Sequence, residues 1–590
     1  MTVSVLTAQI RGQESAHVPP DRRMDWRSRL GVAWPCSFGR YARRVRYGLF
    51  ASFLFFAGIS SAQHSPAESK ATKPPLELPD VIVYGADTAL REAGEKLSFP
   101  RISPSASPSE AITPYPSARA LRGEPALPSR PESPPEQTTV LSSYAGLYSS
   151  WGAQAVHDRT LKKAHLRCKA TLSGTDGQFD NSRGMWGGIE GRMDAPISSS
   201  AAGGLQAKYR RSSYGLYGST NPSNTARQEK VSLQTHIELH QSRPTLSHLQ
   251  LAFQRFTLLP EDTVPDYCER SENLLQTDFV FQDRSGPLPL SVEFHWAGNH
   301  PSGGGSADHL LTLGLKGKVL LLPESSFEAG GIVQWYSSKG NIRKRIFPGG
   351  RLVLRNMTLV HIPIAFHASI GGAYHYYSLA ELLEMNPYAG PHIFTPLEEV
   401  RLQAEAGVEA ELTPGFLLGA AYRWAQRRDD VYWDYDWESG LFRPEQLYEV
   451  VQRQIDFSLT YDSPSDPLRV EAGLSSLRHT VTERCFFKCE PLSEVPFRPK
   501  HRVWGTVSYE ALEGFIVRSD WQWVGCRSAS TQGECKLDPY LVINVGAEKR
   551  IRSAITLLAN IYNLTDDDYE RWYHYPEMGV TVNGGVRVIL

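Results

Sequence analysis

Acidic and aromatic side chains alternate in one run of the sequence, between residues 429 and 438. The run holds five acids among four aromatic residues, and a second aromatic cluster follows at 569–575. Aromatic faces beside hydrogen-bonding groups suit sugars, cationic ligands or metal chelates. The candidate ligand-facing residues are Tyr432, Trp433, Asp434, Tyr435, Asp436, Trp437, Trp572, Tyr573 and His574. The alternative is that the aromatics belong to a membrane-interface girdle and the acids face water.

Two closely spaced cysteine pairs are the next candidates for chemistry. Cys485 and Cys489 form one pair, and Cys526 and Cys535 form the other. In an oxidising compartment such pairs can form disulfide bonds, so these four are the candidate disulfide residues. A metal clip is the alternative for the first pair. No matching set of histidines and cysteines lies nearby in the sequence, so no metal site is expected.

Motifs of enzymes are missing from the sequence. It has no Gly-x-Ser-x-Gly elbow, no His-Glu-x-x-His pair and no phosphate-binding loop. Lysine and arginine number 62 against 63 acidic residues, so the basic excess of a nucleic-acid-binding protein is also missing. We therefore expect no enzyme, no cofactor and no nucleic-acid partner.

Strict period-two alternation dominates from about residue 137 to the C-terminus. In residues 401–411 apolar side chains stand at every second position, from Leu402 to Ala410, with mostly charged or amide side chains between them. Residues 453–461 and 502–510 repeat the pattern. Successive side chains of a strand point to opposite faces, so each segment has one apolar and one polar face.

The lengths of the segments and of their connections favour a membrane barrel over a soluble β-sandwich, which would also alternate. Many segments run for ten or more residues, where soluble strands average about five or six. The short turns lie at 412–415, 462–467, 511–514 and 549–553. Long connections lie between them, near 427–448, 483–500, 525–539 and 563–578. Short periplasmic turns and long outer loops are the layout of an outer-membrane barrel.

Counting strands back from the C-terminus gives 22, beginning with a hairpin at 138–161. The predicted fold class is therefore all-β: one large transmembrane antiparallel β-barrel over residues 137–590. In the last strand, 580–590, the valines are expected to face lipid. Its polar and apolar positions resemble the signal that the barrel-assembly machinery recognises, carried here by Asn583, Gly585, Val588 and Leu590. Membrane lipid and lipopolysaccharide are the expected surroundings, and the basic loop at 339–345 would meet lipopolysaccharide phosphates or water.

Two segments precede the predicted barrel. Residues 1–62 contain a basic stretch, an apolar run at 47–59 and small residues up to Ala62, which is the layout of a cleaved signal peptide. An uncleaved single anchor is the alternative. Residues 63–136 hold 14 of the 40 prolines and few apolar residues, so we expect a disordered periplasmic tail.

One stretch near the C-terminus carries a more specific pattern. It runs Asn560-Ile-Tyr-Asn-Leu-Thr-Asp566, then Tyr569, Tyr575-Pro576, Gly579 and the closing strand, and it closely resembles the C-terminal signature of TonB-dependent receptors. Pro499-Lys-His-Arg502 and Leu537-Asp-Pro-Tyr540 also resemble segments of that family. Met578 and Val580 around Gly579 depart from the usual loop. The resemblance covers roughly residues 137–590.

The N-terminal side resembles the family only in part. Leu78–Gly85 is similar to the segment near the receptors' energy-coupling box, which would place the coupling residues at Asp80, Val81, Ile82, Val83, Tyr84 and Gly85. Such a segment would add a strand to a TonB-type periplasmic partner. A short sticky segment in a tail is the alternative. Only about 50 residues follow before the barrel, too few for the receptors' plug domain, so the barrel is plugless or is filled by another chain or by its own loops.

The resemblance implies an exported protein of the Gram-negative cell outer membrane that binds or takes up a small ligand of the siderophore, cofactor or saccharide class. The alternative function is a plugless passive pore, porin-like, of the same barrel fold.

Overall fold

The computed structural model describes residues 137–220, 224–240, 245–260, 270–283, 288–302, 307–322, 325–359, 361–390, 393–462, 466–483, 494–530 and 536–590. All of them belong to the compact unit Ile82–Leu590. The predicted signal peptide, the tail with its segment 78–85, and the cysteines Cys485, Cys489 and Cys535 lie outside the described residues. Within the described ranges, no helix is long and apolar enough to cross a membrane.

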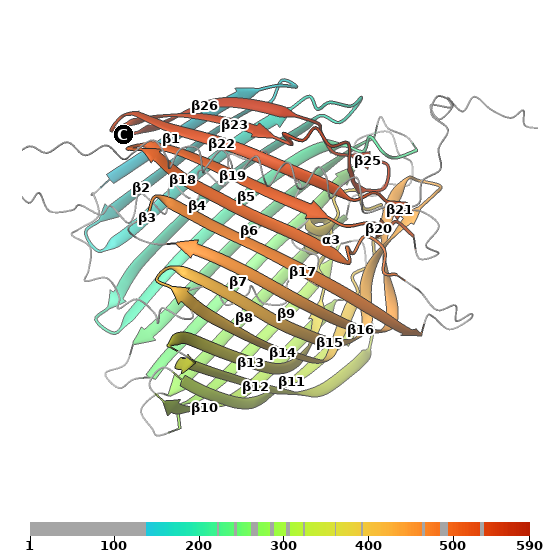
Figure 1. Ribbon diagram of the computed structural model, residues 1–590. Coiled ribbons are helices and arrows are strands. Elements are labelled where there is room, and N and C mark those ends of the chain that lie inside the picture. Colours follow the sequence, from blue (N-terminus) through green and yellow to red (C-terminus); the bar gives the residue numbers. More distant parts are fainter. Residues whose placement is uncertain are drawn as a thin grey trace, which may run out of the picture. The chain divides into compact units, whose positions relative to one another are not determined.

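Twenty-two antiparallel strands form a closed barrel (Figure 1). Each wall strand pairs with the next along the chain, and β1 pairs with β26, so the ring has no free edge. The predicted fold class and the count of 22 are confirmed. The wall strands are β1 Gln137–Gly146, β2 Trp151–Leu161, β3 Ala164–Thr175, β4 Gly184–Ser198, β5 Ala201–Gly215, β6 Thr225–His240, β7 Thr245–Pro260, β8 Arg270–Asp283, β9 Leu290–Pro301, β10 Asp308–Leu322, β11 Ser325–Ser338, β12 Asn341–Leu359, β13 Ile362–Tyr376, β14 Leu397–Thr413, β15 Phe416–Asp436, β16 Leu441–Asp462, β17 Leu468–Glu483, β18 His501–Leu512, β19 Phe515–Val524, β22 Tyr540–Arg552, β23 Ile555–Tyr562 and β26 Thr581–Ile589.

The alternation in the sequence corresponds to the two faces of this wall. On the inner face, Arg423 of β15 forms ion pairs with Glu405 of β14 and Asp456 of β16, both at 3.1 Å. On the outer face of the same strands, apolar side chains such as Val408 and Phe457 are exposed to lipid. In the last strand Val582 is exposed on the outer face, as predicted, while Thr581, Asn583 and Arg587 are buried inside.

The predicted turns and loops separate to the two ends of the barrel. The turns near 414, 513 and 553 lie at the end of the C-terminus, and the connections after residues 483, 524 and 562 lie at the other end. Two predicted loops are wrong. Most of 427–448 is strand, and β15 and β16 continue as a long hairpin whose turn is only 437–440. The physical reason is that alternation persists through the acidic and aromatic run, with Tyr432 opposite Glu445 and Asp434 opposite Arg443. The basic segment at 339–345 is also mostly strand, because β12 begins at Asn341.

The few elements outside the wall gather at this loop end (Figure 1). They are the helix α3 Leu379–Met385 and the short strands β20 Arg527–Ser528, β21 Lys536–Leu537, β24 Glu570–Trp572 and β25 Tyr575–Pro576. The largest cluster of buried apolar side chains also lies at this end, where it joins these elements to the ends of wall strands such as β5 and β7. The end of the barrel that faces outward in the predicted orientation therefore contains a packed core.

Candidate functional site

The connection between β13 and β14 folds inward and contacts the wall at β8, five strands away in the ring. Its helix α3 begins at Ser378, whose hydroxyl accepts a hydrogen bond from the backbone N–H of Glu381 at 3.2 Å. The carboxylate of Glu272 on β8 accepts hydrogen bonds from the N–H groups of Leu379 and Ala380, at 2.8 and 2.9 Å. These contacts fix the first turn of α3 to a wall strand that is distant in the ring.

The tip of the β15/β16 hairpin bends over the same helix connection. Phe442 donates its N–H to the carbonyl of Tyr388 at 3.1 Å and accepts one from Gly390 at 2.8 Å. At the far side of the tip, the N–H of Thr220 donates to the carbonyl of Ser439 at 3.0 Å. Thr220 follows the fifth strand and Ser439 the fifteenth, so their loops lie ten strands apart in a ring of 22. The hairpin therefore bridges nearly the full width of the mouth.

The loop between β23 and β26 completes the assembly. Tyr575 stacks on Tyr388 with ring centroids 3.8 Å apart, and its hydroxyl donates to the carbonyl of Gly440 at 3.2 Å. Tyr217 donates its hydroxyl to the carbonyl of Pro576 at 2.8 Å. Burial raises the pKa of Tyr217 and of Tyr388 above the ordinary value of 10.0, so both rings stay neutral at physiological pH.

We name this assembly the cap and define it as residues 214–220, 377–390, 431–442 and 572–576. Side chains of all four segments share one apolar cluster, in which Tyr377, Leu382 and Phe442 are fully buried. Burying a large apolar side chain stabilises a fold by about 1.5–3 kcal/mol. The other buried members of the cap in this cluster are Tyr214, Leu216, Leu379, Ala380, Leu383, Met385, Tyr388, Ala389, Val431, Trp433, Tyr435, Leu441, Trp572 and Tyr575.

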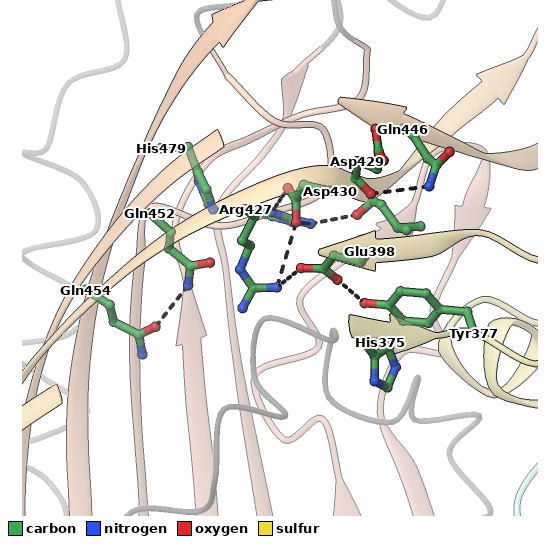
Figure 2. A network of polar contacts seen from close by, with 12 residues as sticks. His375, Tyr377, Glu398, Arg427, Asp429, Asp430, Gln446, Gln452, Gln454 and His479 are labelled. Carbon is green, nitrogen blue, oxygen red and sulfur yellow. Dashed lines mark hydrogen bonds and ion pairs between the residues drawn. The ribbon is translucent and has the colours of Figure 1, made fainter. Parts of the chain in front are cut away.

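A chain of buried charges lies where the hairpin leaves the wall (Figure 2). Tyr377 donates its hydroxyl to Glu398, and Glu398 pairs with Arg427. Arg427 lies 3.8 Å from Asp430, and Asp430 pairs with a further arginine, Arg498, at 2.7 Å. All four charged side chains are at most 7% exposed.

The backbone conformation at Asp429 directs the side chains of Asp429 and Asp430 to different arginines. Its φ of 55° is in the left-handed region. Asp429 meets Arg343 of β12 at 2.9 Å near the surface, while the adjacent Asp430 is fully buried between two arginines. Arg498 also donates to the carbonyl of Val431 at 2.6 Å. Two arginines and two carboxylates thus balance each other and hold the base of the hairpin against β14 and the segment at 494–500.

Below the cap lies a polar cavity of about 1210 Å³ inside the barrel. Its lining comes from two groups of wall strands, β1–β7 and β16–β23. It also includes Glu384 of α3, which pairs with Lys230 of β6 at 2.7 Å. Other charged residues of the lining are Lys169, Glu190, Lys208, Arg210, Arg211, Asp462, Arg469, Glu471, Arg518, Asp520 and Glu548. Among the described residues, no cluster of three or more His, Cys, Asp or Glu could hold a metal ion.

The two predicted aromatic segments come together in the cap. Trp433 lies 6.2 Å from Trp572, and Tyr435 lies 5.2 Å from Tyr573, between ring centroids. Most of these aromatics are buried, because they form the cap's core, and Tyr432 packs on Leu447 in a neighbouring cluster. The exposed part is a small aromatic surface at the tip, which we name the tip patch: Trp437, Tyr573 and His574.

The other predicted site residues have different outcomes. The coupling segment 80–85 lies outside the described residues, as do three of the four candidate disulfide cysteines. Cys526 lies at the loop end, directly after β19. Both disulfides and the ligand-facing role stay predictions.

The helix of the cap was not predicted, although the sequence contains a signal for it. Ser378-Leu-Ala-Glu381 has the spacing of a helix capping box, followed by an apolar run. The buried network was also missed, because charged residues next to aromatics resemble a solvated loop.

Comparison with solved structures finds similar barrels. A mutant of the ferric enterobactin receptor (PfeA) of Pseudomonas aeruginosa has a TM-score of 0.58 at 13% identity, covering 77% of this chain and 80% of that one. The siderophore receptor PiuA of Acinetobacter baumannii has a TM-score of 0.60 at 11% identity, covering 77% and 82%. The copper transporter OprC has a TM-score of 0.59 at 13% identity, covering 77% and 80%.

No protein-family model and no curated protein matches the sequence. At 11–13% identity the likeness concerns the fold. In its fold, the chain is a closed β-barrel like those of these two receptors and this transporter.

Proposed function

We propose that the protein is an outer-membrane receptor that binds a small ligand at its outer end and admits it when the cap opens. One observation carries the proposal: loops ten strands apart touch across the mouth, through Thr220 and Ser439. A receptor needs a closed resting state and a surface that recognises its ligand. The cap supplies the first, and the tip patch is our candidate for the second.

The passive-pore alternative is less well supported. A passive pore needs a permanent water path, whereas here apolar side chains from four segments pack together across the mouth. The polar cavity below the cap would then be a chamber that the ligand enters after the cap moves.

The chemistry of the tip patch indicates the class of ligand. Trp437 is 58% exposed and lies 5.6 Å from the ring of Tyr573. The acidic residues Asp434, Asp436 and Glu438 lie beside it in the sequence. Aromatic faces with nearby carboxylates suit ligands that carry positive charge or sugar-like hydroxyl groups. The named neighbours, receptors for a ferric siderophore and a transporter for copper, support a metal chelate as the first class to test.

Energy coupling remains part of the proposal. Residues 80–85 would pair with a TonB-type periplasmic protein by adding a strand to it. Deleting these six residues should abolish uptake while leaving ligand binding at the outer end unchanged. Uptake that continues at the normal rate would reject coupling through this segment.

The binding surface is tested by titrating the purified protein with a panel of ferric siderophores, cobalamin and oligosaccharides. Trp437→Ala should weaken binding of the recognised ligand by about five- to thirtyfold, since stacking on one aromatic face contributes roughly 1–2 kcal/mol. Trp151→Ala is the matched control, because Trp151 is 40% exposed on the outer face of β2, away from the tip. Equal affinity in both variants would exclude the tip patch as the ligand-binding surface.

A further inference from the structure

Two arginines face each other directly on the outer surface of the barrel. Arg453 of β16 is paired with Arg478 of β17, and Trp424 of β15 is the partner of Arg453 on the other side. All three belong to the outward set of their strands, since Ile455 and Phe457 on β16 and Leu474 on β17 share their parity and are exposed. Both arginines are exposed.

This pair is unfavourable unless something neutralises it. Side chains directly opposite in a sheet have Cβ atoms about 4.5–5.5 Å apart, and like charges there destabilise the pairing. None of the ion pairs that the structure describes around β16 and β17 involves either arginine. The nearest acid of the same parity on β16, Glu449, is engaged by Gln426 and by Arg401 at 3.4 Å.

Three other outward arginines near the loop end have partners. Arg211 and Arg227 share Glu229 at 3.7 and 2.8 Å. Arg428 lies over the ring of Tyr448, 4.8 Å from its centroid. The wall thus supplies a counter-charge or a ring to these three and leaves Arg453 and Arg478 open on one side.

The position of Arg453 and Arg478 along the barrel axis indicates which part of the membrane surrounds them. Four outward apolar positions, from Tyr461 to Ile455, separate Arg453 from the turn at the C-terminal end. Eight residues at about 3.3 Å each, on a strand tilted by about 40°, rise by roughly 20 Å along the barrel axis. The apolar band of such barrels is about 25 Å tall. Arg453 and Arg478 therefore lie at the outer edge of the band, where lipid headgroups begin.

Polar groups continue below the pair on the same face. Ser476 of β17 is two residues from Arg478 and is paired with His501 of β18, which is exposed. Two guanidinium forks with a hydroxyl and an imidazole beside them form a set of hydrogen-bond donors for a phosphate group, which arginine binds through two parallel bonds.

We propose that Arg453 and Arg478 bind the phosphate of a phosphorylated lipid headgroup in the outer leaflet. The site rests on the outer-membrane location under the proposed function but not on the ligand or on the cap. A lipid is favoured over a dissolved anion because the exposed apolar side chains of Ile455 and Phe457, below Arg453 on β16, would hold the acyl chains. The bound phosphate would neutralise the like-charge pair and stabilise the β16–β17 wall.

The test places the full-length protein in nanodiscs of phosphatidylcholine with a minor fraction of phosphatidic acid and counts retained lipids by native mass spectrometry. The wild type should retain phosphatidic acid. The Arg453→Gln/Arg478→Gln double variant should bind it at least about tenfold more weakly, since charge-assisted hydrogen bonds of this kind contribute that factor or more. Arg255→Gln, which removes one exposed outward arginine from β7, is the matched control and should behave as the wild type.

Three further results decide the outcome. Arg453→Lys/Arg478→Lys keeps the charge but loses the forked donors, so an intermediate affinity supports the site. Retention by the Gln double variant equal to the wild type overturns it, as does displacement of the lipid by millimolar inorganic phosphate, which would assign the pair to a dissolved anion. Heat-modifiable migration on semi-native gels shows separately whether each variant forms the barrel. Loss of the barrel in the wild type would reject the proposed function rather than this site.

Discussion

The backbone N–H of Thr220 lies 3.0 Å from the carbonyl oxygen of Ser439, although their loops stand ten strands apart in the ring. A hydrogen bond of this length requires both loops to reach over the mouth. Around it, α3, the β15/β16 hairpin and the loop before β26 bury one apolar cluster. The predictions below concern whether this contact closes the barrel and what holds it in place.

Gly440 is the position where the two loops leave no room for a side chain. Its φ is 70°, and a Cβ atom there would lie 2.8 Å from the Cα of Ser219 and from the N of Thr220. Gly440→Ala should therefore separate the loops and raise the ion conductance of the barrel in a planar bilayer. Gly340→Ala is the matched control: its φ is 78°, which costs a similar 1–2 kcal/mol or so for a non-glycine residue, but nothing lies within 4 Å. Equal conductance in both variants would contradict the role of this contact.

A covalent link across the mouth tests the same contact directly. We expect Thr220→Cys/Ser439→Cys to form a disulfide on oxidation, because residues joined by this backbone hydrogen bond approach within the range that a disulfide spans. Mass spectrometry of the digested protein would identify the link, and oxidation should stop ligand uptake until a reductant is added. The single-cysteine variants control for pairing with natural cysteines. An unlinked double variant would place the two loops apart in the membrane.

The buried charges should matter far more than the exposed ones beside them. Asp430→Asn leaves Arg427 and Arg498 buried with only Glu398 to balance them, which should lower the free energy of unfolding by about 3–5 kcal/mol. The adjacent Asp429→Asn breaks a pair with the half-exposed Arg343 and should cost less than about 1 kcal/mol. Urea unfolding in lipid vesicles compares the two variants. Similar losses would mean that the network at the base of the hairpin is accessible to water.

Alkaline pH should loosen the cap. Burial raises the pKa of Tyr217 and Tyr388 above 10.0, so the folded cap favours the neutral hydroxyls. Their contribution to the stability of the cap is complete below about pH 10 and is lost as the pH rises beyond it. The reason is that tyrosines in the unfolded cap then ionise, whereas the packed tyrosines stay neutral. Proteolysis of the cap, followed from pH 8 upward, should accelerate above about pH 10. The Tyr217→Phe/Tyr388→Phe variant should lose this acceleration. If the pH dependence of proteolysis is unchanged in this variant, the acceleration comes from other ionisable groups.

The wall was predictable from the sequence, and the cap only in its pieces. Alternation with a period of two depends on neighbours along the chain, so it revealed the faces of strands such as 401–411 and the count of 22. It also extended through residues 430–436, where the acidic and aromatic composition nevertheless suggested a loop. The contact of Thr220 with Ser439 joins parts of the chain that no local pattern relates. Asp430 resembled a solvated acid because its closest partner, Arg498, is 68 residues away and becomes its neighbour only in the folded barrel.

Single-channel conductance in a planar bilayer tests the central claim most directly, by comparing the full-length protein with a variant in which residues 378–394 are replaced by a short Gly/Ser linker. If the protein's own loops close the mouth, the full-length protein should carry almost no steady current, and the variant without α3 should carry a large one. A large steady current through the full-length protein, equal to that of the variant, would contradict the account and indicate a passive pore.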